Sequence, residues 1–333
     1  MERITIIGLG LIGGSIGLAL KRSQLKELHI VGVARSRETV QRAKKIGAID
    51  EEMRDPAEAV AGAKLVIVAA PILATPQIFR DIAPALEPGT IVTDAASTKG
   101  NVMAWARELL PEHVQFVGGH PMAGKETSGI DSADADLFRD KTWVIVPAVG
   151  ASEGAVRTVV GVAQELGASP TYMDADEHDS YVAAVSHLPL ALSSVLFSMV
   201  FQSAAWPEMA KLASSGFRDA TRLASGSPEM AHDIMHSNRD NVLHWLDRFQ
   251  DELYRLRATI AAGDSEPLLE AFARPQIERD NYMLNGAPRR DVSAPIENVS
   301  LGDILLGSKI NSFMKKQQNM IKDMEANEKG KRR

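Results

Sequence analysis

The chain has 333 residues, of which 45% are hydrophobic and 24% are charged, fractions typical of a soluble globular protein. It contains no cysteine, which excludes disulfide frameworks, cysteine nucleophiles and thiolate metal sites, and we expect no metal site. The 37 basic and 43 acidic residues give a net charge of −6, whereas nucleic-acid-binding proteins usually carry a basic excess. The length predicts two domains, and we expect a cytoplasmic enzyme that binds neither nucleic acid nor membrane.

From residue 4 to about residue 147, short apolar runs alternate with helical patterns. Each run is nearly all apolar, as in strands buried on both faces of a parallel sheet. The runs are Ile4–Ile7, His29–Val33, Leu65–Val68, Thr90–Thr93, Val114–Val117 and Trp143–Val146. Helical segments, such as Glu38–Ile46 and Thr75–Leu86, fall between them. The alternation predicts an α/β, doubly wound Rossmann-type domain over residues 1–150.

After about residue 150 the pattern becomes mainly α-helical. We expect a helix over Glu153–Leu166 and a last strand at Thr171–Met173. Asp174 is the expected N-cap of a long apolar helix that continues to about Gln202. Within that helix, the apolar stretch Leu188–Phe201 is about 14 residues long, which is too short to span a bilayer.

Two further helices are predicted downstream. One begins at Ser227, and the other covers Asn238–Ala262 with apolar residues at helical spacing. These helices offer more apolar face than one small layer can bury, so we expect residues 151–287 to form an all-α substrate and dimerisation domain of a homodimer. Residues 288–333 form a polar, Lys-rich C-terminal tail, which we expect to be partly disordered.

A glycine motif follows the first predicted strand and opens a helix. It reads G-x-G-x-x-G, a pattern in which the first glycine permits a tight turn, the second lets the backbone approach a pyrophosphate and the third allows close helix–strand packing. The helix N-terminus adds free N–H groups for the anion. The candidate cofactor-binding residues are Gly8, Gly10, Leu11, Ile12 and Gly13. The alternative is a glycine-rich turn with only a structural role.

The end of the second strand bears on the type of cofactor. NAD enzymes usually place Asp or Glu there to accept hydrogen bonds from the adenosine ribose, but this chain has Arg35, Ser36 and Arg37. Arginine pairs well with a 2′-phosphate, so the sequence favours NADP over NAD. The alternative is that these residues are solvated and only open the next helix.

A histidine in a glycine-rich segment follows the fifth strand. Ligands of such sheets bind at the carboxyl ends of the strands, so His120 is expected to point into the crevice beside the nicotinamide. There it can accept the proton of a hydroxyl group while the carbon of that group gives up hydride. The alternative is a histidine that only caps the loop.

Two clusters in the helical half are candidates for substrate binding. His187 lies two residues before Pro189, and a proline inside a helix often marks an irregular, functional turn. Arg218 and Arg222 are four residues apart and share a face if the segment is helical, which suits a substrate with two carboxylates. Asp219 offers the alternative of a purely structural ion pair.

Together these motifs resemble the prephenate/arogenate dehydrogenase family, the cyclohexadienyl dehydrogenases of tyrosine biosynthesis. The resemblance covers about residues 3–285. Its marks are the glycine motif, Thr93–Lys99, Gly119–Gly124, Ser186–Pro189 and Gly216–Arg222, in this order.

The resemblance implies NAD(P)-dependent oxidative decarboxylation of prephenate or arogenate. His120 matches the catalytic histidine that takes the proton of the ring hydroxyl as hydride leaves for the nicotinamide. Loss of the ring carboxylate as carbon dioxide follows, driven by aromatisation. Ser97 matches a serine that helps to hold this histidine and the nicotinamide, and we also expect Pro71 to contact the cofactor.

The resemblance also implies substrate-binding roles. Arg222 matches the arginine that binds a substrate carboxylate, and Arg218 takes a supporting cationic position. His187 matches a histidine on the substrate side, and Glu126 lies at a position linked to substrate choice. Two other readings compete: a Rossmann dehydrogenase of the β-hydroxyacid type, which relies on a catalytic lysine, and a non-catalytic dinucleotide-binding sensor.

Overall fold

The structure is a computed structural model that describes residues 2–23, 25 and 28–286. It divides into two compact units, residues 1–246 and residues 247–333. The described part of the second unit is helical over residues 247–262 and in α13 (Ser265–Asn285), with Gly263 between them at φ 75°. The predicted tail at 288–333 lies outside the described residues.

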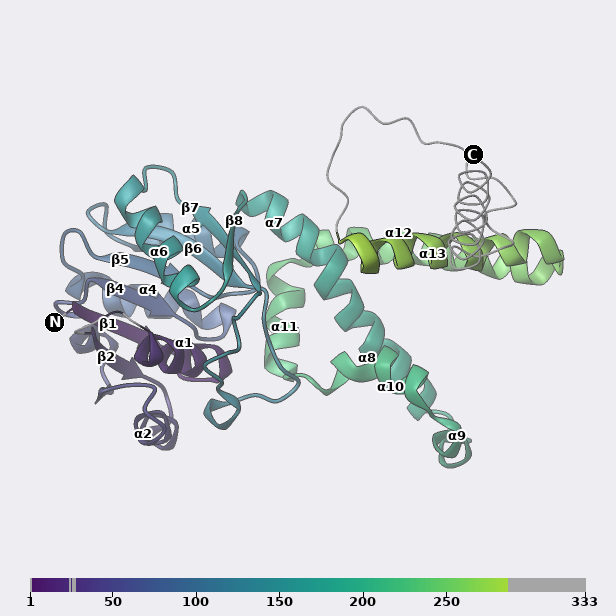
Figure 1. The fold of residues 1–333 in the computed structure, drawn as a ribbon, viewed down its shortest axis with the longest axis horizontal. Coiled ribbons are helices and arrows are strands. Elements are labelled where there is room, and N and C mark those ends of the chain that lie inside the picture. The colour runs from purple at the N-terminus through teal and green to yellow at the C-terminus, as the bar shows by residue number, and fades with distance from the viewer. Residues whose placement is uncertain (1, 24, 26–27, 287–333) are drawn as a thin grey trace, which may run out of the picture. The chain divides into compact units, whose positions relative to one another are not determined.

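An eight-stranded sheet forms the centre of the first unit (Figure 1). Its strand order is β3-β2-β1-β4-β5-β6-β7-β8, and β1 to β6 pair in parallel. This order places a topological switch point between β1 and β4, where such sheets bind ligands. The strands are β1 (Glu2–Ile7), β2 (Leu28–Val33), β3 (Glu51–Met53), β4 (Leu65–Val68), β5 (Ile91–Asp94), β6 (Gln115–Pro121), β7 (Thr142–Pro147) and β8 (Ser169–Tyr172). The predicted doubly wound α/β fold is confirmed.

Two features of the sheet differ from the sequence prediction. β7 runs antiparallel to β6, with His120 opposite Val144, although its apolar run was expected to be a parallel strand; burial on both faces gives either direction the same composition. β3 is short and polar, so the sequence has no apolar run there that would predict a strand. The last strand expected at Thr171–Met173 is present as β8, which pairs with β7.

Helices cover both faces of the sheet. They are α1 (Leu11–Arg22), α2 (Arg37–Lys45), α3 (Pro56–Val60), α4 (Thr75–Ile82), α5 (Gly100–Leu109) and α6 (Glu153–Glu165). Successive strand residues point to opposite faces, so Ile6 belongs to one buried apolar cluster and Ile7 to the other. Both faces of the central strands are therefore buried among apolar side chains, and the polar groups of the candidate site lie at the strand ends.

The chain continues from β8 into helices. They are α7 (Ala175–Val182), α8 (Leu188–Phe201), α9 (Trp206–Leu212), α10 (Ser215–Thr221), α11 (Pro228–Ser237) and α12 (Arg239–Ala262). Asp174 caps α7, because its carboxylate accepts a hydrogen bond from the Glu177 N–H at 2.8 Å. A π-helical turn, Ala183–His187, joins α7 to α8 just before Pro189. The expected cap and the expected irregular turn are both confirmed.

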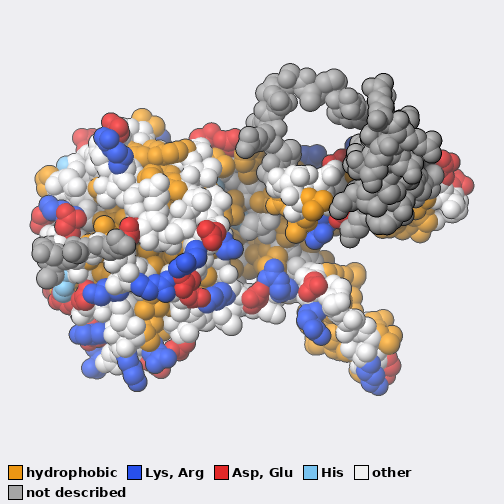
Figure 2. Space-filling model, viewed as in Figure 1, with side chains coloured by type: hydrophobic (Ala, Val, Ile, Leu, Met, Phe, Trp, Pro, Cys, Tyr) orange, Lys and Arg blue, Asp and Glu red, His pale blue; other side chains and the backbone are white. Residues whose placement is uncertain are grey.

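The long helix expected from Asp174 to about Gln202 is present as the continuous helical run from α7 to α8. It covers 27 residues, Ala175–Phe201, and by length and composition it could cross a membrane. Its first half is held against the sheet domain through buried polar residues described below. Its second half exposes large apolar side chains, namely Val195, Phe197, Met199 and Phe201. This exposed apolar surface is visible along α8 in the space-filling view (Figure 2).

Candidate functional site

The glycine turn after β1 has the geometry of a dinucleotide cradle. Gly8 has φ +96°, and a Cβ atom on Gly13 would lie 1.9 Å from the Gly8 carbonyl oxygen. A Cβ on Gly10 would meet nothing within 4 Å, so that side of the turn is open. Gly10 is also the N-cap of α1 and offers no side-chain cap, which leaves the helix N-terminus able to bind an anion. These residues fit a pyrophosphate.

Of the residues after β2, one caps a helix and another is accessible to a ligand. Ser36 is the N-cap of α2, and its hydroxyl accepts a hydrogen bond from the Thr39 N–H at 3.4 Å. Arg35 is 83% exposed at its side chain and lies 3.5 Å from the Glu229 carboxylate of α11. Arg37 begins α2. Ser36 therefore opens the helix, while Arg35 remains accessible to a ligand.

His120 lies near the carboxyl end of β6 and is 7% exposed. Its ring Nδ1 is 2.8 Å from Nε2 of His178, and Nδ1 of His178 is 2.7 Å from the Asp179 carboxylate. Burial lowers the pKa of His120 well below its usual value, and the nearby His178, Lys99 and His187 lower it further. The imidazole is therefore neutral at pH 7 and can accept a proton.

A buried ion pair fixes the backbone that precedes this histidine. The Lys99 ammonium is fully buried, pairs with the Asp94 carboxylate and donates to the Gly119 carbonyl at 2.7 Å. Asp94 in turn accepts hydrogen bonds from the Gly119 N–H at 3.1 Å and the Ala96 N–H at 2.9 Å. Ser97 is half-buried in the same loop, and the structure records no hydrogen bond between Ser97 and His120.

His187 presents a buried hydrogen-bonding atom that lacks a partner. Asn238 Nδ2 donates to the Asp179 carbonyl at 2.7 Å and lies 3.1 Å from Nδ1 of His187. Nδ1 therefore accepts, and the proton of the neutral ring sits on Nε2, which has no partner among the described residues. Burial lowers the pKa of His187 to about 4. An orphaned buried donor of this kind indicates a place for a ligand acceptor.

Glu126 and Arg222 form an ion pair across 96 residues of sequence. Both side chains are about half exposed, at 45% and 56%. The pKa of the Glu126 carboxyl is lowered by its own backbone N–H and by the Arg222 guanidinium. α10 ends at Thr221 and Arg222 begins a 3₁₀ turn, so the single α-helix expected to carry both Arg218 and Arg222 is not formed. Arg218 is exposed on α10.

Sequence reasoning missed His178, Asp179 and Asn238. The first two lie four and five residues after the Asp174 N-cap, and a His-Asp pair in the first turns of an apolar helix is the signal that could have indicated them. Asn238 lies at the junction of α11 and α12 and carries no comparable signal. Pro71, predicted to contact the cofactor, lies in the loop that follows β4.

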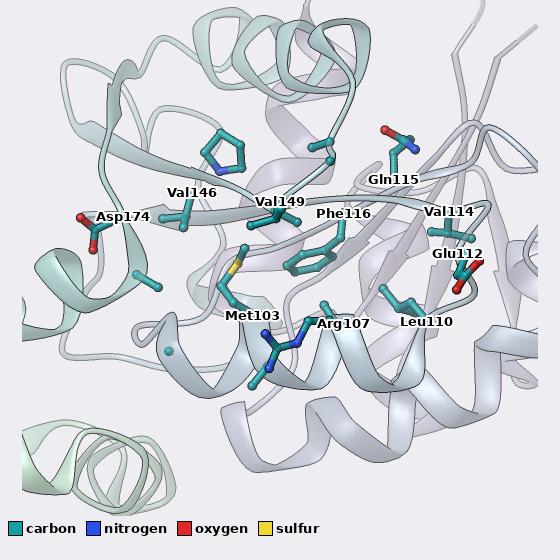
Figure 3. A pocket seen from close by; sticks show the side chains of 18 of the residues that line it. Met103, Arg107, Leu110, Glu112, Val114, Gln115, Phe116, Val146, Val149 and Asp174 are labelled. Atoms are coloured by element: carbon teal, nitrogen blue, oxygen red, sulfur yellow. The ribbon is translucent and has the colours of Figure 1, made fainter.

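A cavity of about 740 Å³ lies elsewhere, between α5, β6 and the loop after β7 (Figure 3). Its lining includes Met103, Arg107, Phe116, Val149 and Asp174. Neither His120 nor His187 lines it, but Gly100, whose N–H donates to the Asp179 carboxylate, does.

Comparisons with known proteins match both halves of the chain. Residues 16–172 match the family described as prephenate dehydrogenase, nucleotide-binding domain, and residues 174–274 match its dimerization domain. The prephenate dehydrogenase of Bacillus subtilis is 34% identical over 285 residues, covering 85% of this chain and 76% of that protein. The cyclohexadienyl dehydrogenase of Zymomonas mobilis is 33% identical, covering 84% and 95%.

Solved structures agree in fold. The prephenate dehydrogenase of Aquifex aeolicus, in complex with hydroxyphenyl propionate and NAD+, superposes with a TM-score of 0.79 at 29% identity and covers 84% of this chain and 98% of that one. Arogenate dehydrogenase of Synechocystis gives 0.71 at 30%, covering 84% and 100%. With both domains matched in order, and a bacillary relative 34% identical over most of its length, this chain belongs to the prephenate dehydrogenase family of NAD-binding oxidoreductases.

Proposed function

We propose that this protein catalyses the oxidative decarboxylation of prephenate or arogenate, in tyrosine biosynthesis, with a nicotinamide dinucleotide as oxidant. The observation that carries the proposal is the placement of a neutral, buried His120 at the end of β6, in the same sheet as the open glycine cradle. A chain of polar contacts through His178, Asp179 and Asn238 joins it to the orphaned donor on His187.

In the proposed reaction, Nε2 of His120 accepts the proton of the ring hydroxyl. The nicotinamide, when bound, accepts the hydride from the carbon that bears this hydroxyl. The bond between the ring and its carboxylate then breaks, carbon dioxide leaves, and the electron pair of that bond completes the aromatic ring as a phenolate, whose oxygen takes the proton back from His120. Ser97, in the loop after β5, is proposed to help to hold His120 and the nicotinamide.

The substrate side is proposed to consist of one neutral donor and one cationic site. His187 donates from Nε2 to a substrate oxygen, because this proton has no other acceptor. Arg222 binds a substrate carboxylate in exchange for Glu126, and Arg218 adds positive charge. Glu126 contributes to substrate choice, since a carboxylate attracts the amino group of arogenate, which prephenate lacks.

We propose NADP as the preferred cofactor. Arg35 is accessible, its contact with Glu229 is long at 3.5 Å, and no acid occupies positions 34–37. A 2′-phosphate can displace Glu229 and receive charge-assisted hydrogen bonds from the guanidinium. Arg37 and Pro71 are proposed as further cofactor contacts, together with the backbone of Gly8–Gly13.

We propose a cytoplasmic homodimer built through the helical half of the chain. The match to a dimerization domain and the apolar side chains exposed on α8, such as Phe197 and Met199, support it. We also propose a functional division into a dinucleotide-binding domain, a helical domain that ends near residue 287, and a separate tail.

A two-by-two kinetic comparison tests the proposed function. Prephenate and arogenate are each mixed with NAD+ and with NADP+, and the reduced cofactor is followed by its absorbance. We expect turnover in at least one substrate–cofactor pair, with a higher kcat/KM for NADP+ than for NAD+. No turnover of either substrate by the folded protein would refute the proposed activity, and a higher kcat/KM with NAD+ would refute the cofactor preference alone.

A further inference from the structure

We propose that His178 and Asp179 are positioning residues that fix the proton of His120 on Nδ1, so that its Nε2 is left unprotonated to act as the base. This inference rests on the proposed function, in which His120 takes the hydroxyl proton. It adds to that function two residues of α7 that act only through His120.

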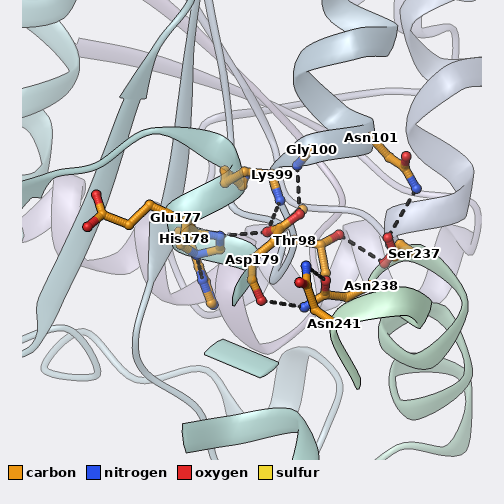
Figure 4. Close-up of polar contacts among 12 residues, drawn as sticks. Thr98, Lys99, Gly100, Asn101, Glu177, His178, Asp179, Ser237, Asn238 and Asn241 are labelled. Carbon is orange, nitrogen blue, oxygen red and sulfur yellow. Dashed lines mark hydrogen bonds and ion pairs between the residues drawn. The ribbon is translucent and has the colours of Figure 1, made fainter. Parts of the chain in front are cut away.

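The inference starts from Asp179, which has acceptors only. One carboxylate oxygen accepts hydrogen bonds from the Lys99 N–H at 2.7 Å and from His178 Nδ1 at 2.7 Å. The other accepts from the Gly100 N–H at 2.8 Å, at the N-terminus of α5 (Figure 4). Three N–H donors therefore occupy both oxygens of this carboxylate. His178 must therefore donate from Nδ1.

The second step assigns the proton between the two histidines. His178 is 0% exposed, and with its proton on Nδ1 the neutral ring has a lone pair at Nε2. That lone pair lies 2.8 Å from Nδ1 of His120, so Nδ1 of His120 must carry the proton. The neutral ring then has its own lone pair at Nε2. The tautomer of His120 is thus set by the Asp179 carboxylate, to which it is linked through the ring of His178.

Other groups near the pair do not supply this function. Glu177, next in sequence to His178, accepts a hydrogen bond from the Tyr181 hydroxyl at 2.7 Å instead, and its carboxylate points away from the network in Figure 4. The Lys99 ammonium is engaged by Asp94 and the Gly119 carbonyl. Among the described residues, Asp179 is the carboxylate hydrogen-bonded to His178.

The same hydrogen bonds also stabilise His120 after it has taken up a proton. When Nε2 takes the hydroxyl proton, Nδ1 still donates to His178, and the imidazolium charge is opposed by the buried Asp179 carboxylate through that ring. Neither His178 nor Asp179 takes up this proton, which His120 holds until it returns to the phenolate oxygen of the product. This is the orienting and stabilising function that a carboxylate performs behind a histidine base.

Two substitutions of His178 separate positioning from packing. In His178→Gln, the side-chain oxygen reaches the position of Nε2 and can accept from His120. In His178→Asn, the shorter amide reaches the position of Nδ1 and leaves His120 without an acceptor. We expect His178→Asn to lower kcat by about 10²- to 10³-fold with little change in KM, and His178→Gln to restore kcat to within about tenfold of wild type. Equal losses in both variants, or none in His178→Asn, would overturn the proposal.

Nitrogen NMR of the histidine-labelled full-length protein reads the tautomer directly. The chain has eight histidines, and the His120→Asn spectrum identifies the His120 signals by their disappearance. We expect a protonated Nδ1 and an unprotonated Nε2 on His120 in the wild type, and loss of this single tautomer in Asp179→Asn. A wild-type His120 that carries its proton on Nε2 would overturn the proposal, whatever the variants do.

The NMR experiment keeps this inference separable from the proposed function. If the wild-type protein turns over neither prephenate nor arogenate, the proposed function fails, yet the spectrum still reports which nitrogen of His120 is protonated. If turnover is normal and the tautomer is the opposite one, only the positioning role fails.

Discussion

Acidification provides a quantitative test of the buried state of His187. Its pKa is lowered to about 4 by burial, against about 6.5 in an unfolded chain. Between these two values the unfolded state binds more protons than the native state, so the free energy of unfolding falls as the pH falls. The stability contributed by the neutral ring is therefore complete above about pH 6.5 and is lost progressively down to about pH 4.

The magnitude follows from the two pKa values. Integrated from pH 7 to pH 5, a shift from 6.5 to about 4 lowers the free energy of unfolding by about 2 kcal/mol. His120 adds a loss of the same sign, because burial lowers its pKa as well. Replacing His187 with Asn keeps an acceptor for Asn238 and removes only the titrating ring.

Urea unfolding at pH 7 and at pH 5, at one fixed protein concentration, measures the difference. We expect the loss between the two pH values to be smaller by about 2 kcal/mol in His187→Asn than in wild type. His236→Gln, which removes an exposed histidine of α11, is the matched control and should leave the loss unchanged. A His187→Asn protein with the wild-type pH dependence would show that His187 is not a buried neutral ring.

Three further substitutions test the other parts of the site. Arg222→Ala should raise the KM for substrate by about tenfold and change kcat less, because the half-exposed guanidinium binds a carboxylate in ground and transition states alike; an unchanged KM would leave Arg222 with only its Glu126 ion pair. Arg35→Asp should lower kcat/KM for NADP+ by about 10- to 100-fold and leave NAD+ nearly unaffected, and equal effects on both cofactors would argue against a phosphate contact. Gly13→Ala would place a Cβ atom 1.9 Å from the Gly8 carbonyl oxygen, so we expect a lower melting temperature and loss of cofactor binding, and retained cofactor binding would contradict the tight turn seen here.

Features that depend on neighbouring residues in sequence were predictable. The glycine motif, the Asp174 cap and the irregular turn before Pro189 each follow from local backbone chemistry, and the structure has all three. The alternation of apolar runs with helical patterns likewise predicted the Rossmann-type sheet and placed His120 at a strand end.

Features that depend on contacts between distant residues were not predictable in the same way. The direction of β7 is set by its pairing with β6, and its apolar composition fits either direction. His120 and His178 are 58 residues apart, and Glu126 and Arg222 are 96 apart. The sequence identified three of these four side chains as candidates, but only the fold shows which of them meet, and why His178 matters.

The central claim is that one base, His120, couples hydride loss to decarboxylation. The most direct measurement is the ratio of reduced cofactor formed to carbon dioxide released, in wild type and in His120→Asn. We predict a ratio of about one in wild type, and a fall of about 10²- to 10⁴-fold in both rates together in a folded His120→Asn protein that still binds cofactor. A His120→Asn variant with near wild-type rates, or cofactor reduction without release of carbon dioxide, would contradict the account.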